Sequence, residues 1–553
     1  MLSVLVGSKP STVLGVTGAR PAARVRPLVW LGVAGIAAIV IHACGYVFGT
    51  ANQTTYFIEP LRQAHPELYR HDWFAATTQY HRAFSFVASW LFRVDDRGAI
   101  ACAVANAVVM AGVVVALFWL VAGVAQRRAF VGFVLVTGWI LVDGGRSMAG
   151  SYLWAGYLQP SLLGTLGWIV ALGAFVRGRP LATGLAAAAG GAFHANYLVL
   201  GLGVFTLAEL VTSRSAKRVA LVVAPQLVVL AFLAPDLFAS ASGEDPDLAL
   251  WILTRFHATG HYLPGAIARH IPQLMCWLGL AIVVAPIAVP KVDAMRRLAT
   301  WGWIAGAISV LAVPVLLIPG LLPLTRLYVW RLAPFARLVA MIVIALAVSA
   351  TVDDPSRWRG RTRRAVLAIA LAAWLAWTTA GWAIAANAVG IALALLAPRL
   401  RLGPVVALVG FAFAADVHRQ TITHPRLSLM GDNALYAWAR ADTPVDAVFL
   451  TPPRLNYFRL HARRAVVVDL KSPPLVPDEL VAWYRRIGVV VGLAHAQNLR
   501  EVHQAWDAAT HAELMVRARG FGAQYLVVER AHDAEALRGS IFASDSYVVY
   551  PVD

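Results

Sequence analysis

The sequence predicts an α-helical polytopic membrane protein with about 13 transmembrane helices and a C-terminal soluble α/β domain. Of its 553 residues, 59% are hydrophobic and 14% are charged, whereas soluble proteins are about 45–50% apolar and about 25% charged. One soluble core of this size is excluded, because cores divide into domains beyond about 250–300 residues. The three cysteines, Cys44, Cys102 and Cys276, all lie in apolar stretches, which excludes a disulfide framework.

Thirteen apolar segments are candidate spans, given that a spanning helix needs about 20 mostly apolar residues. They are residues 28–48, 98–122, 129–146, 160–176, 181–194, 197–211, 218–234, 272–289, 297–318, 332–351, 364–379, 381–397 and 402–417. The two short segments around His194, and the two around Ala380, could each instead be one long helix.

The charge pattern predicts how these spans are oriented. The formal net charge is +18, and the arginines lie in short clusters between apolar runs, as in cytoplasmic loops of membrane proteins, so no nucleic-acid partner is expected. With a cytoplasmic tail at 1–27, alternation places the basic loops near 127, 177, 214–218, 291–297, 357–364 and 399–401 inside. The transmembrane domain is then 28–417, and an extracytoplasmic domain spans 418–553.

The first outer loop, 49–97, contains an apolar stretch that is too short to cross a membrane. Residues 83–92 read AFSFVASWLF, and a span here would invert every later loop. We therefore predict an amphipathic segment that lies on the outer membrane surface.

From about His418 the composition becomes that of a soluble domain. Helices are expected near 433–440, 479–486 and 501–519, and strands near 446–451, 464–469, 487–491, 523–528 and 547–550. Alternating strands and helices favour a mixed or parallel sheet. Because GxGxxG, Walker A and HExxH motifs are all absent, this domain is expected to be a lid or an acceptor platform.

The first outer loop is rich in groups that could carry chemistry. Glu59 and Asp72 are separated by Pro60 and Pro66, which break any continuous helix, so the two carboxylates can converge. His71 and Trp73 flank Asp72; the alternative is an interfacial helix that Asp72 caps. His71, Trp73 and His81 are candidate cavity or substrate-binding residues. The histidines of this loop, His65, His71 and His81, lack a metal-binding spacing.

Three further places carry polar groups at the predicted outer ends of spans. Asp143 and Arg146 end the third span, and Tyr152, Trp154 and Tyr157 follow them; they either line the bundle or pair to hold a turn. His194 and Asn196 lie between two short apolar halves, as in a cavity wall; a structural His194 is the alternative.

The third place is the run TRLYVWRLAPFAR at 325–337, whose three arginines depart from the positive-inside pattern. On one continuous helix Arg326 and Arg337 would lie about 20° apart and could bind an anion such as a lipid phosphate; snorkelling to head groups is the alternative. Arg255 and His257 add positive charge in the loop 235–271, which also carries aromatic residues.

In layout the whole chain resembles the GT-C superfamily of multi-span glycosyltransferases: one span, a long first outer loop with acids, many helices and an outward C-terminal domain. The resemblance implies transfer of a sugar from a polyprenyl-phosphate donor, with inversion, to an extracytoplasmic glycan, lipid or protein acceptor. It implies Asp72 as the base, with Glu59 behind it. Arg326, Arg337 and Arg146 would stabilise the leaving phosphate. No cofactor is required, and a divalent metal is not obligatory for a single phosphate.

The motifs Asn52-Gln53-(x)2-Tyr56, His71-Asp72-Trp73 and Thr451-Pro452-Pro453 with Phe458-Arg459 also resemble an uncharacterised bacterial family of multi-pass proteins, which implies the bacterial inner membrane. Two other functions remain open. The chain could carry a lipid-linked glycan or a solute, with Asp143, Arg146 and His194 along the path, or it could be a non-catalytic partner in envelope polysaccharide assembly.

Overall fold

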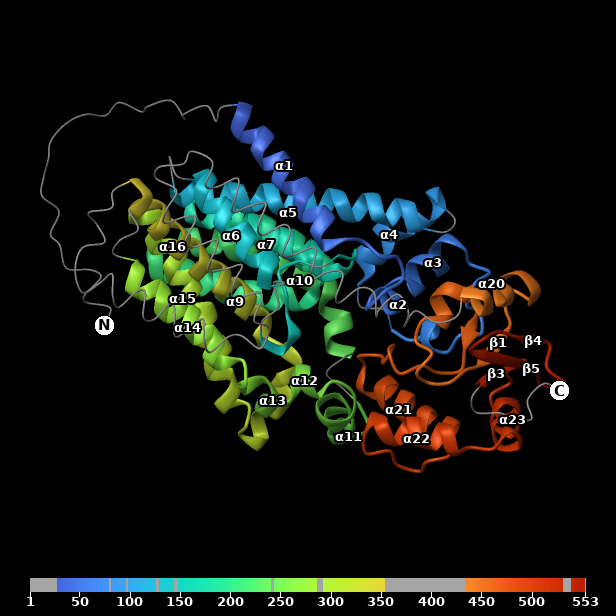
Figure 1. The fold of residues 1–553 in the computed structure, drawn as a ribbon. Helices are drawn as coiled ribbons and strands as arrows, with labels where there is room; N and C mark the ends of the chain where they lie inside the picture. Colours follow the sequence, from blue (N-terminus) through green and yellow to red (C-terminus); the bar gives the residue numbers. More distant parts are fainter. Residues whose placement is uncertain are drawn as a thin grey trace, which may run out of the picture.

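The computed structural model describes residues 27–78, 81–95, 98–125, 129–143, 148–154, 156–239, 243–285, 292–353, 433–530 and 539–552. The molecule is elongated, with a bundle of long helices at one end and the C-terminal domain at the other (Figure 1). The three predicted spans between 364 and 417 lie outside the described residues.

Within the described residues, each of the ten predicted spans before residue 354 corresponds to one helix. These helices are α1 (Pro27–Cys44), α5 (Ala99–Ala125), α6 (Ala129–Asp143), α7 (Pro160–Val176), α8 (Pro180–Phe193), α9 (Ala195–Ser213), α10 (Ala216–Ala239), α14 (Ile271–Val284), α15 (Val292–Val315) and α16 (Ala333–Asp353). Within the described ranges, six helices are long and apolar enough to cross a membrane, and four shorter apolar helices accompany them. The prediction of a polytopic helical protein is confirmed.

The two short apolar segments around His194 are separate helices. His194 alone joins α8 to α9 in an extended backbone conformation (φ −151°, ψ 102°), and α8 packs against α7, α9 and α10. Glycine permits the close approach of α8 to α7, because a Cβ on Gly167 would lie 2.5 Å from the Cα of Gly190.

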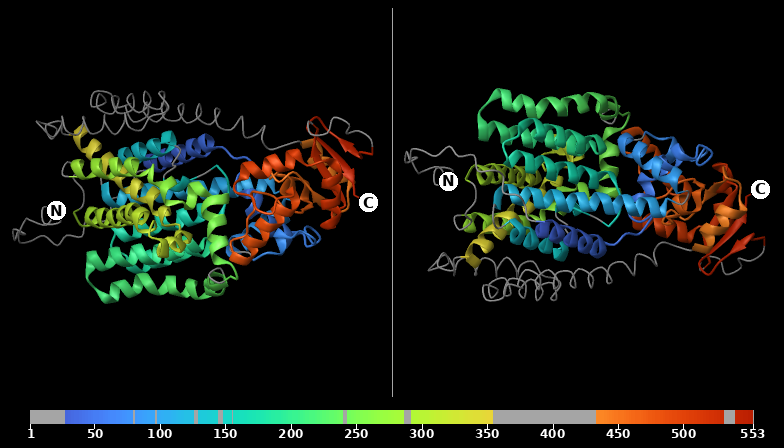
Figure 2. Two further views of the ribbon diagram at one scale, coloured as in Figure 1. Left: turned by 90° about the horizontal axis from the view of Figure 1, so that it is seen from below. Right: turned by 90° about the horizontal axis from the view of Figure 1, so that it is seen from above.

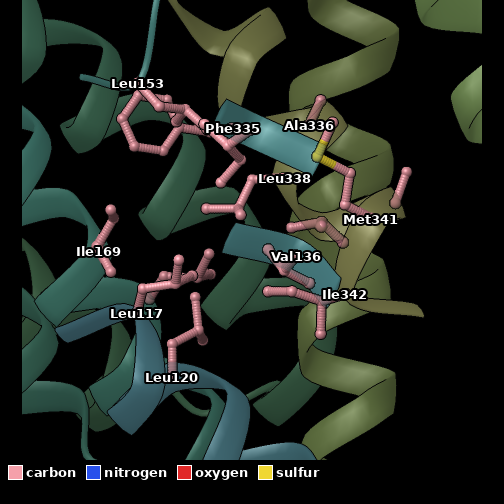
Figure 3. Packing of buried hydrophobic residues seen from close by; sticks show 14 of the residues in the cluster. Leu117, Leu120, Val136, Leu153, Ile169, Phe335, Ala336, Leu338, Met341 and Ile342 are labelled. Carbon is pink, nitrogen blue, oxygen red and sulfur yellow. The ribbon is translucent and has the colours of Figure 1, made fainter. Parts of the chain in front are cut away.

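Helix α16 is buried and packs against α6, α14 and α15. Across its apolar window 89% of the residues are buried, so it contacts neighbouring helices rather than lipid. Figure 3 shows part of the core that surrounds it, with Leu117 and Leu120 of α5, Val136 of α6, Ile169 of α7, and Leu338 and Ile342 of α16. This packing fixes the position of the segment that precedes α16.

Loops that were predicted to lie on the cytoplasmic side meet at the bundle end far from the C-terminal domain. The guanidinium of Arg218 donates to the Gly178 carbonyl (2.9 Å). Arg218 and Arg297 both pair with the buried carboxylate of Glu209, at 2.6 and 2.8 Å. Three loops are therefore joined at this end.

The first outer loop folds at the opposite end, next to the C-terminal domain (Figure 2). It contains α2 (Gln53–Tyr56), α3 (Ile58–Ala64), the short 3-10 helix Phe74–Ala76 and α4 (Arg82–Val94). Helix α4 is amphipathic: Phe84, Ala88 and Phe92 are buried, and it packs on α3. Its other face exposes apolar side chains, Phe86, Val87, Trp90 and Val94, as expected of a helix on a membrane surface.

The C-terminal domain contains a five-stranded mixed sheet with strand order β2-β1-β3-β5-β4. Its elements are α20 (Asn433–Asp442), β1 (Val448–Leu450), β2 (Ala465–Val466), α21 (Pro477–Val491), α22 (Leu499–Ala508), α23 (His511–Gly520), β3 (Tyr525–Glu529), β4 (Phe542–Ala543) and β5 (Tyr547–Pro551). Strand β1 pairs in parallel with β2 and β3, and β5 runs antiparallel to β3 and β4.

One predicted strand of this domain is wrong. Residues 487–491 (IGVVV) form the last turns of α21, which begins with Pro477 at its first position and ends at Gly492 with φ 75°. A short apolar run does not by itself distinguish a strand from a buried helix segment. Burial of Tyr484, Ile487 and Val491 at helical spacing explains why the helix continues.

The segment after α10 attaches the bundle to the C-terminal domain. It comprises α11 (Pro246–Trp251), the π-helix Ile252–His257, α12 (Thr259–Tyr262) and α13 (Pro264–Ala268). Trp251 and Phe256 pack against Tyr484 at ring-centroid distances of 5.7 and 5.0 Å. This segment thus completes the core of the C-terminal domain.

Candidate functional site

Arg331 is the centre of a polar and aromatic cluster at the bundle end that faces the C-terminal domain. It belongs to the short 3-10 helix Val329–Leu332, directly before α16. Its guanidinium lies over the rings of Tyr328 (4.9 Å) and Tyr197 (5.5 Å). Among the described residues, Arg331 forms no ion pair with a carboxylate, and its buried Nε has no hydrogen-bond acceptor.

The backbone at Tyr328 determines where Arg331 points. Tyr328 has a left-handed conformation (φ 47°, ψ 48°) that separates the 3-10 helix Pro319–Leu327 from the one that carries Arg331. Its hydroxyl donates to the Ala149 carbonyl (2.6 Å) and lies 2.9 Å from Nδ1 of His261. The 3-10 helix Met148–Gly150 and α12 therefore hold the tyrosine on which the guanidinium lies.

Two histidines and Tyr56 form another part of the cluster. The rings of His81 and His194 are 4.8 Å apart, and Tyr56 contacts His81 edge to face at 5.0 Å. His194 also contacts the ring of Tyr197 (5.4 Å). These side chains come from α2, from the residue before α4 and from the junction of α8 and α9.

The electrostatics of the cluster keep His81 neutral. Burial lowers the pKa of His81 from 6.5 to about 4, the hydrogen bond to the Phe193 carbonyl opposes this, and the positive charge of Arg331 lowers it further. Burial raises the pKa of Tyr56 to about 12. At neutral pH the cluster therefore carries the positive charge of Arg331 beside neutral histidine and tyrosine side chains.

A network of amides and hydroxyls connects the first loop to the start of α7. Asn52 donates to Oε1 of Gln159 (3.3 Å), and Gln159 donates to the hydroxyl of Tyr152. The hydroxyls of Tyr152 and Tyr157 are 3.1 Å apart. The residues Asn52 and Tyr56, which belong to one motif of the sequence, therefore lie at this same end of the bundle.

The structure brings together three residues that the sequence suggested as cavity residues, His81, His194 and Asn196. Asn196 donates to the carbonyl of Leu327, next to Tyr328. Asp143 is the last residue of α6, and Arg146 lies outside the described residues.

The premise that Arg326 and Arg337 share one helical face is wrong. They belong to different elements, because the left-handed Tyr328 interrupts the helix between them. Arg326 is half-buried, and Arg337 is buried within the bundle with 1% exposure, so Arg337 does not snorkel to head groups. Their suggested role in phosphate binding stays a prediction.

Asp72 lies in the interface between the first loop and the C-terminal domain. Its carboxylate is 1% exposed and accepts from Nε of Arg459 (2.8 Å), from the Val466 backbone N–H (3.0 Å) and from the Ala75 backbone N–H (2.9 Å). Arg459 also pairs with the buried Asp469. This geometry favours a structural role for Asp72 over that of a base.

The neighbours of Asp72 also lie at this interface rather than in the Arg331 cluster. The imidazole of His71 is 61% exposed, with Nε2 3.9 Å from a carboxylate oxygen of Asp446. The guanidinium of Arg486 lies over the ring of Trp73 (5.5 Å).

Glu59 lies on the wall of a separate cavity of about 360 Å³ that Arg62, Tyr69 and Arg70 also line. Its carboxylate accepts from Arg62 (2.7 Å) and Gln63 (2.9 Å). Glu59 and Asp72 therefore have different partners, and Asp72 does not line this cavity.

Arg255 and His257 both belong to the π-helix, but they face different surroundings. Arg255 is exposed, whereas His257 is hydrogen-bonded to the Leu470 carbonyl (3.0 Å) and contacts the ring of Trp483 at 5.4 Å. Burial lowers the pKa of His257 to about 4, and the charge of Lys471 contributes in the same direction. His257 therefore helps to attach the C-terminal domain.

The sequence marks Arg331 as one of three arginines in the run 325–337 but does not single it out as a site residue. The available signal was its position three residues after Tyr328 in a run with aromatic residues on both sides. A helical-wheel argument could not use this signal, because it assumes one uniform helix through Tyr328.

The described part of the chain contains no group of three His, Cys, Asp or Glu side chains that could hold a metal ion.

Comparisons with known proteins connect this geometry to one fold. Residues 432–490 match the model of a domain of unknown function, DUF6798. No curated protein matches the chain. The crystal structure of ArnT from Cupriavidus metallidurans in the apo state is similar, with a TM-score of 0.51 and 14% identity, over 94% of this chain and 97% of that chain.

Two further solved structures resemble the chain at lower scores. One is ArnT from Cupriavidus metallidurans bound to undecaprenyl phosphate (TM-score 0.48, 13% identity, 94% of this chain and 97% of that chain). The other is the Archaeoglobus fulgidus oligosaccharyltransferase tethered to an acceptor peptide (TM-score 0.44, 12% identity, 91% of this chain and 69% of that chain). The likeness to apo ArnT shows that the chain has a GT-C-like fold, as its layout predicts.

Proposed function

We propose that the chain transfers a sugar from a polyprenyl-phosphate donor to an extracytoplasmic acceptor, with inversion, and that Arg331 binds the donor phosphate. One observation carries this proposal. Arg331 has no carboxylate partner among the described residues, and its guanidinium lies over the rings of Tyr328 and Tyr197. Arg331 is half-buried, and its Nε lies away from water without an acceptor. A guanidinium that is partly removed from water without a counter-ion favours an anion at this place.

A phosphate fits this place better than a carboxylate-bearing side chain. Arginine presents its N–H donors in a planar fork that matches phosphate oxygens, and hydrogen bonds between two charged groups are the strongest kind. In the reaction the phosphate becomes the leaving group and gains negative charge, which a fixed guanidinium stabilises. The half-buried ring of Tyr56 offers an apolar face on which a sugar can stack.

The orientation in the membrane follows from the same proposal. Under the positive-inside rule, the basic loops near Arg177, Arg218 and Arg297 would face the cytoplasm. The Arg331 cluster and the C-terminal domain would then lie on the outer side of the bacterial inner membrane, where a lipid-linked donor enters from the outer leaflet.

Binding of undecaprenyl phosphate tests the role of Arg331. ArnT has been crystallised with this lipid, which makes it the first probe to use. A charge-assisted hydrogen bond contributes about 1.5–3 kcal/mol, so Arg331→Gln should weaken binding about 10- to 150-fold in nanodiscs. Arg500→Gln, which removes an exposed charge from α22, is the matched control.

Arg326→Gln and Arg337→Gln belong in the same experiment, because both arginines remain candidates for the phosphate. Unchanged affinity in a folded Arg331→Gln protein would contradict the proposal. If all three variants bound the lipid normally, the carrier and assembly-partner functions would become the better explanations.

A further inference from the structure

The position of His81 fixes which of its ring nitrogens carries a proton. His81 directly precedes α4, and its Nδ1 lies 3.2 Å from the carbonyl oxygen of Phe193. A carbonyl oxygen can only accept, so Nδ1 must carry the hydrogen and donate it. In the neutral imidazole, Nε2 is then the unprotonated nitrogen and can accept a proton.

The surroundings of His81 leave that nitrogen available. Its side chain is half-buried, and among the described residues no group hydrogen-bonds to Nε2. Tyr56 and His194 both contact the ring, at 5.0 and 4.8 Å between ring centroids. Within the described ranges, no Asp or Glu pairs with Tyr56, His81, His194 or Arg331, so the cluster offers imidazole nitrogens rather than a carboxylate as proton acceptors.

We propose that Nε2 of His81 is the general base of the transfer reaction, an inference that rests on the proposed function. Nε2 takes the proton of the acceptor hydroxyl as its oxygen bonds to the anomeric carbon of the donor sugar. The bond between that carbon and the phosphate oxygen breaks with inversion, and its electron pair leaves with the polyprenyl phosphate. Arg331 stabilises the phosphate, and the proton remains on His81.

Electrostatics couple this base to the donor. In the free protein burial lowers the pKa of His81 to about 4, and the positive charge of Arg331 contributes in the same direction. A bound phosphate compensates the charge of Arg331, and an imidazolium beside it is then attracted rather than repelled. The donor complex should therefore raise the pKa of His81, so that the base becomes stronger only when the donor is present.

His81→Gln is the variant that isolates proton transfer. The glutamine amide can still donate to the Phe193 carbonyl but cannot take up a proton at neutral pH. We expect kcat to fall 10²- to 10⁴-fold, the usual contribution of general-base catalysis, while affinity for undecaprenyl phosphate stays within twofold. His503→Gln in α22 of the C-terminal domain is the matched control and should transfer normally. The assay measures polyprenyl phosphate released from a panel of polyprenyl-phosphate sugars.

The pH profile adds a signature that a structural role would not give. A base must be neutral, so activity should fall as the pH drops through its pKa, and the acid limb of kcat/KM should lie near pH 4 in the free enzyme. The acid limb of kcat should lie at higher pH, and His81→Gln should lose both limbs. The donor is a phosphodiester and does not itself titrate in this range.

A second measurement needs no knowledge of the sugar. Nitrogen-15 NMR of the histidine rings, with the His81 signal assigned by its absence in His81→Gln, should show this pKa rising when undecaprenyl phosphate is added. Normal transfer by His81→Gln, or an unchanged His81 pKa in a protein that binds the lipid, would overturn the inference and leave the proposed function standing. Normal lipid binding by Arg331→Gln would instead overturn the proposed function.

Discussion

Asp72→Asn should open the contact between the first loop and the C-terminal domain. One carboxylate oxygen of Asp72 accepts from both Arg459 and the Val466 N–H, and the other accepts from the Ala75 N–H. In asparagine one of these positions becomes an N–H₂ group that faces donors. Arg459 is only about 2% exposed but keeps its pair with Asp469, so the variant loses one charge-assisted hydrogen bond in a buried setting, about 1.5–3 kcal/mol.

Hydrogen–deuterium exchange of the full chain in nanodiscs measures this cost locally. At about 1.4 kcal/mol per tenfold change, the amides of residues 459–466 should exchange roughly 10- to 150-fold faster in Asp72→Asn. Asp446→Asn is the matched control. Its carboxylate is 54% exposed and lies 3.9 Å from His71, and exposed pairs contribute about 0–1 kcal/mol.

The same variant separates the two interpretations of Asp72. If Asp72 were the base, Asp72→Asn would lose transfer while the interface amides exchanged at their normal rates. The asparagine could still cap the helix, at a loss of about 1 kcal/mol or less. Unchanged exchange together with lost transfer would therefore refute the structural role and return the base assignment to Asp72. If Glu59→Gln were inactive and Asp72→Asn remained active, the role of the base would instead belong to Glu59.

Two further predictions concern the bundle and its orientation. Gly167→Ala should lower the free energy of unfolding by about 1–3 kcal/mol, and with it the melting temperature, because the new Cβ would meet the backbone of Gly190. Gly203→Ala on α9, with nothing within 4 Å, should be neutral or stabilise the helix by up to about 1 kcal/mol; equal melting temperatures for both variants would contradict the close-approach argument. A reporter fused after Asp553 should be active only outside the cytoplasm, and activity restricted to the cytoplasm would reverse the proposed orientation.

Local sequence patterns predicted the parts of this fold that depend on local physics. Hydropathy over about 20 residues marked α5, α9 and α15 because a spanning helix satisfies its backbone internally and must be apolar along its length. The strand at 487–491 was wrong because an apolar run of five residues has no period that separates a strand from the end of a helix. The first-loop residues His81 and Tyr56 were in a segment that composition marked as functional.

By itself, the sequence determined the membrane class, the ten apolar helices that were predicted as spans before residue 354 and the presence of an α/β domain after them, since each depends on the composition and periodicity of one segment. Only the tertiary structure decided which charges meet. Asp72 finds Arg459 across 387 residues of chain, and that pairing removes the most conspicuous acid of the first loop from solvent. A left-handed Tyr328 selects Arg331 instead of Arg326 and Arg337 as the centre of the polar cluster, because a single break in the backbone changes which side chains share a face.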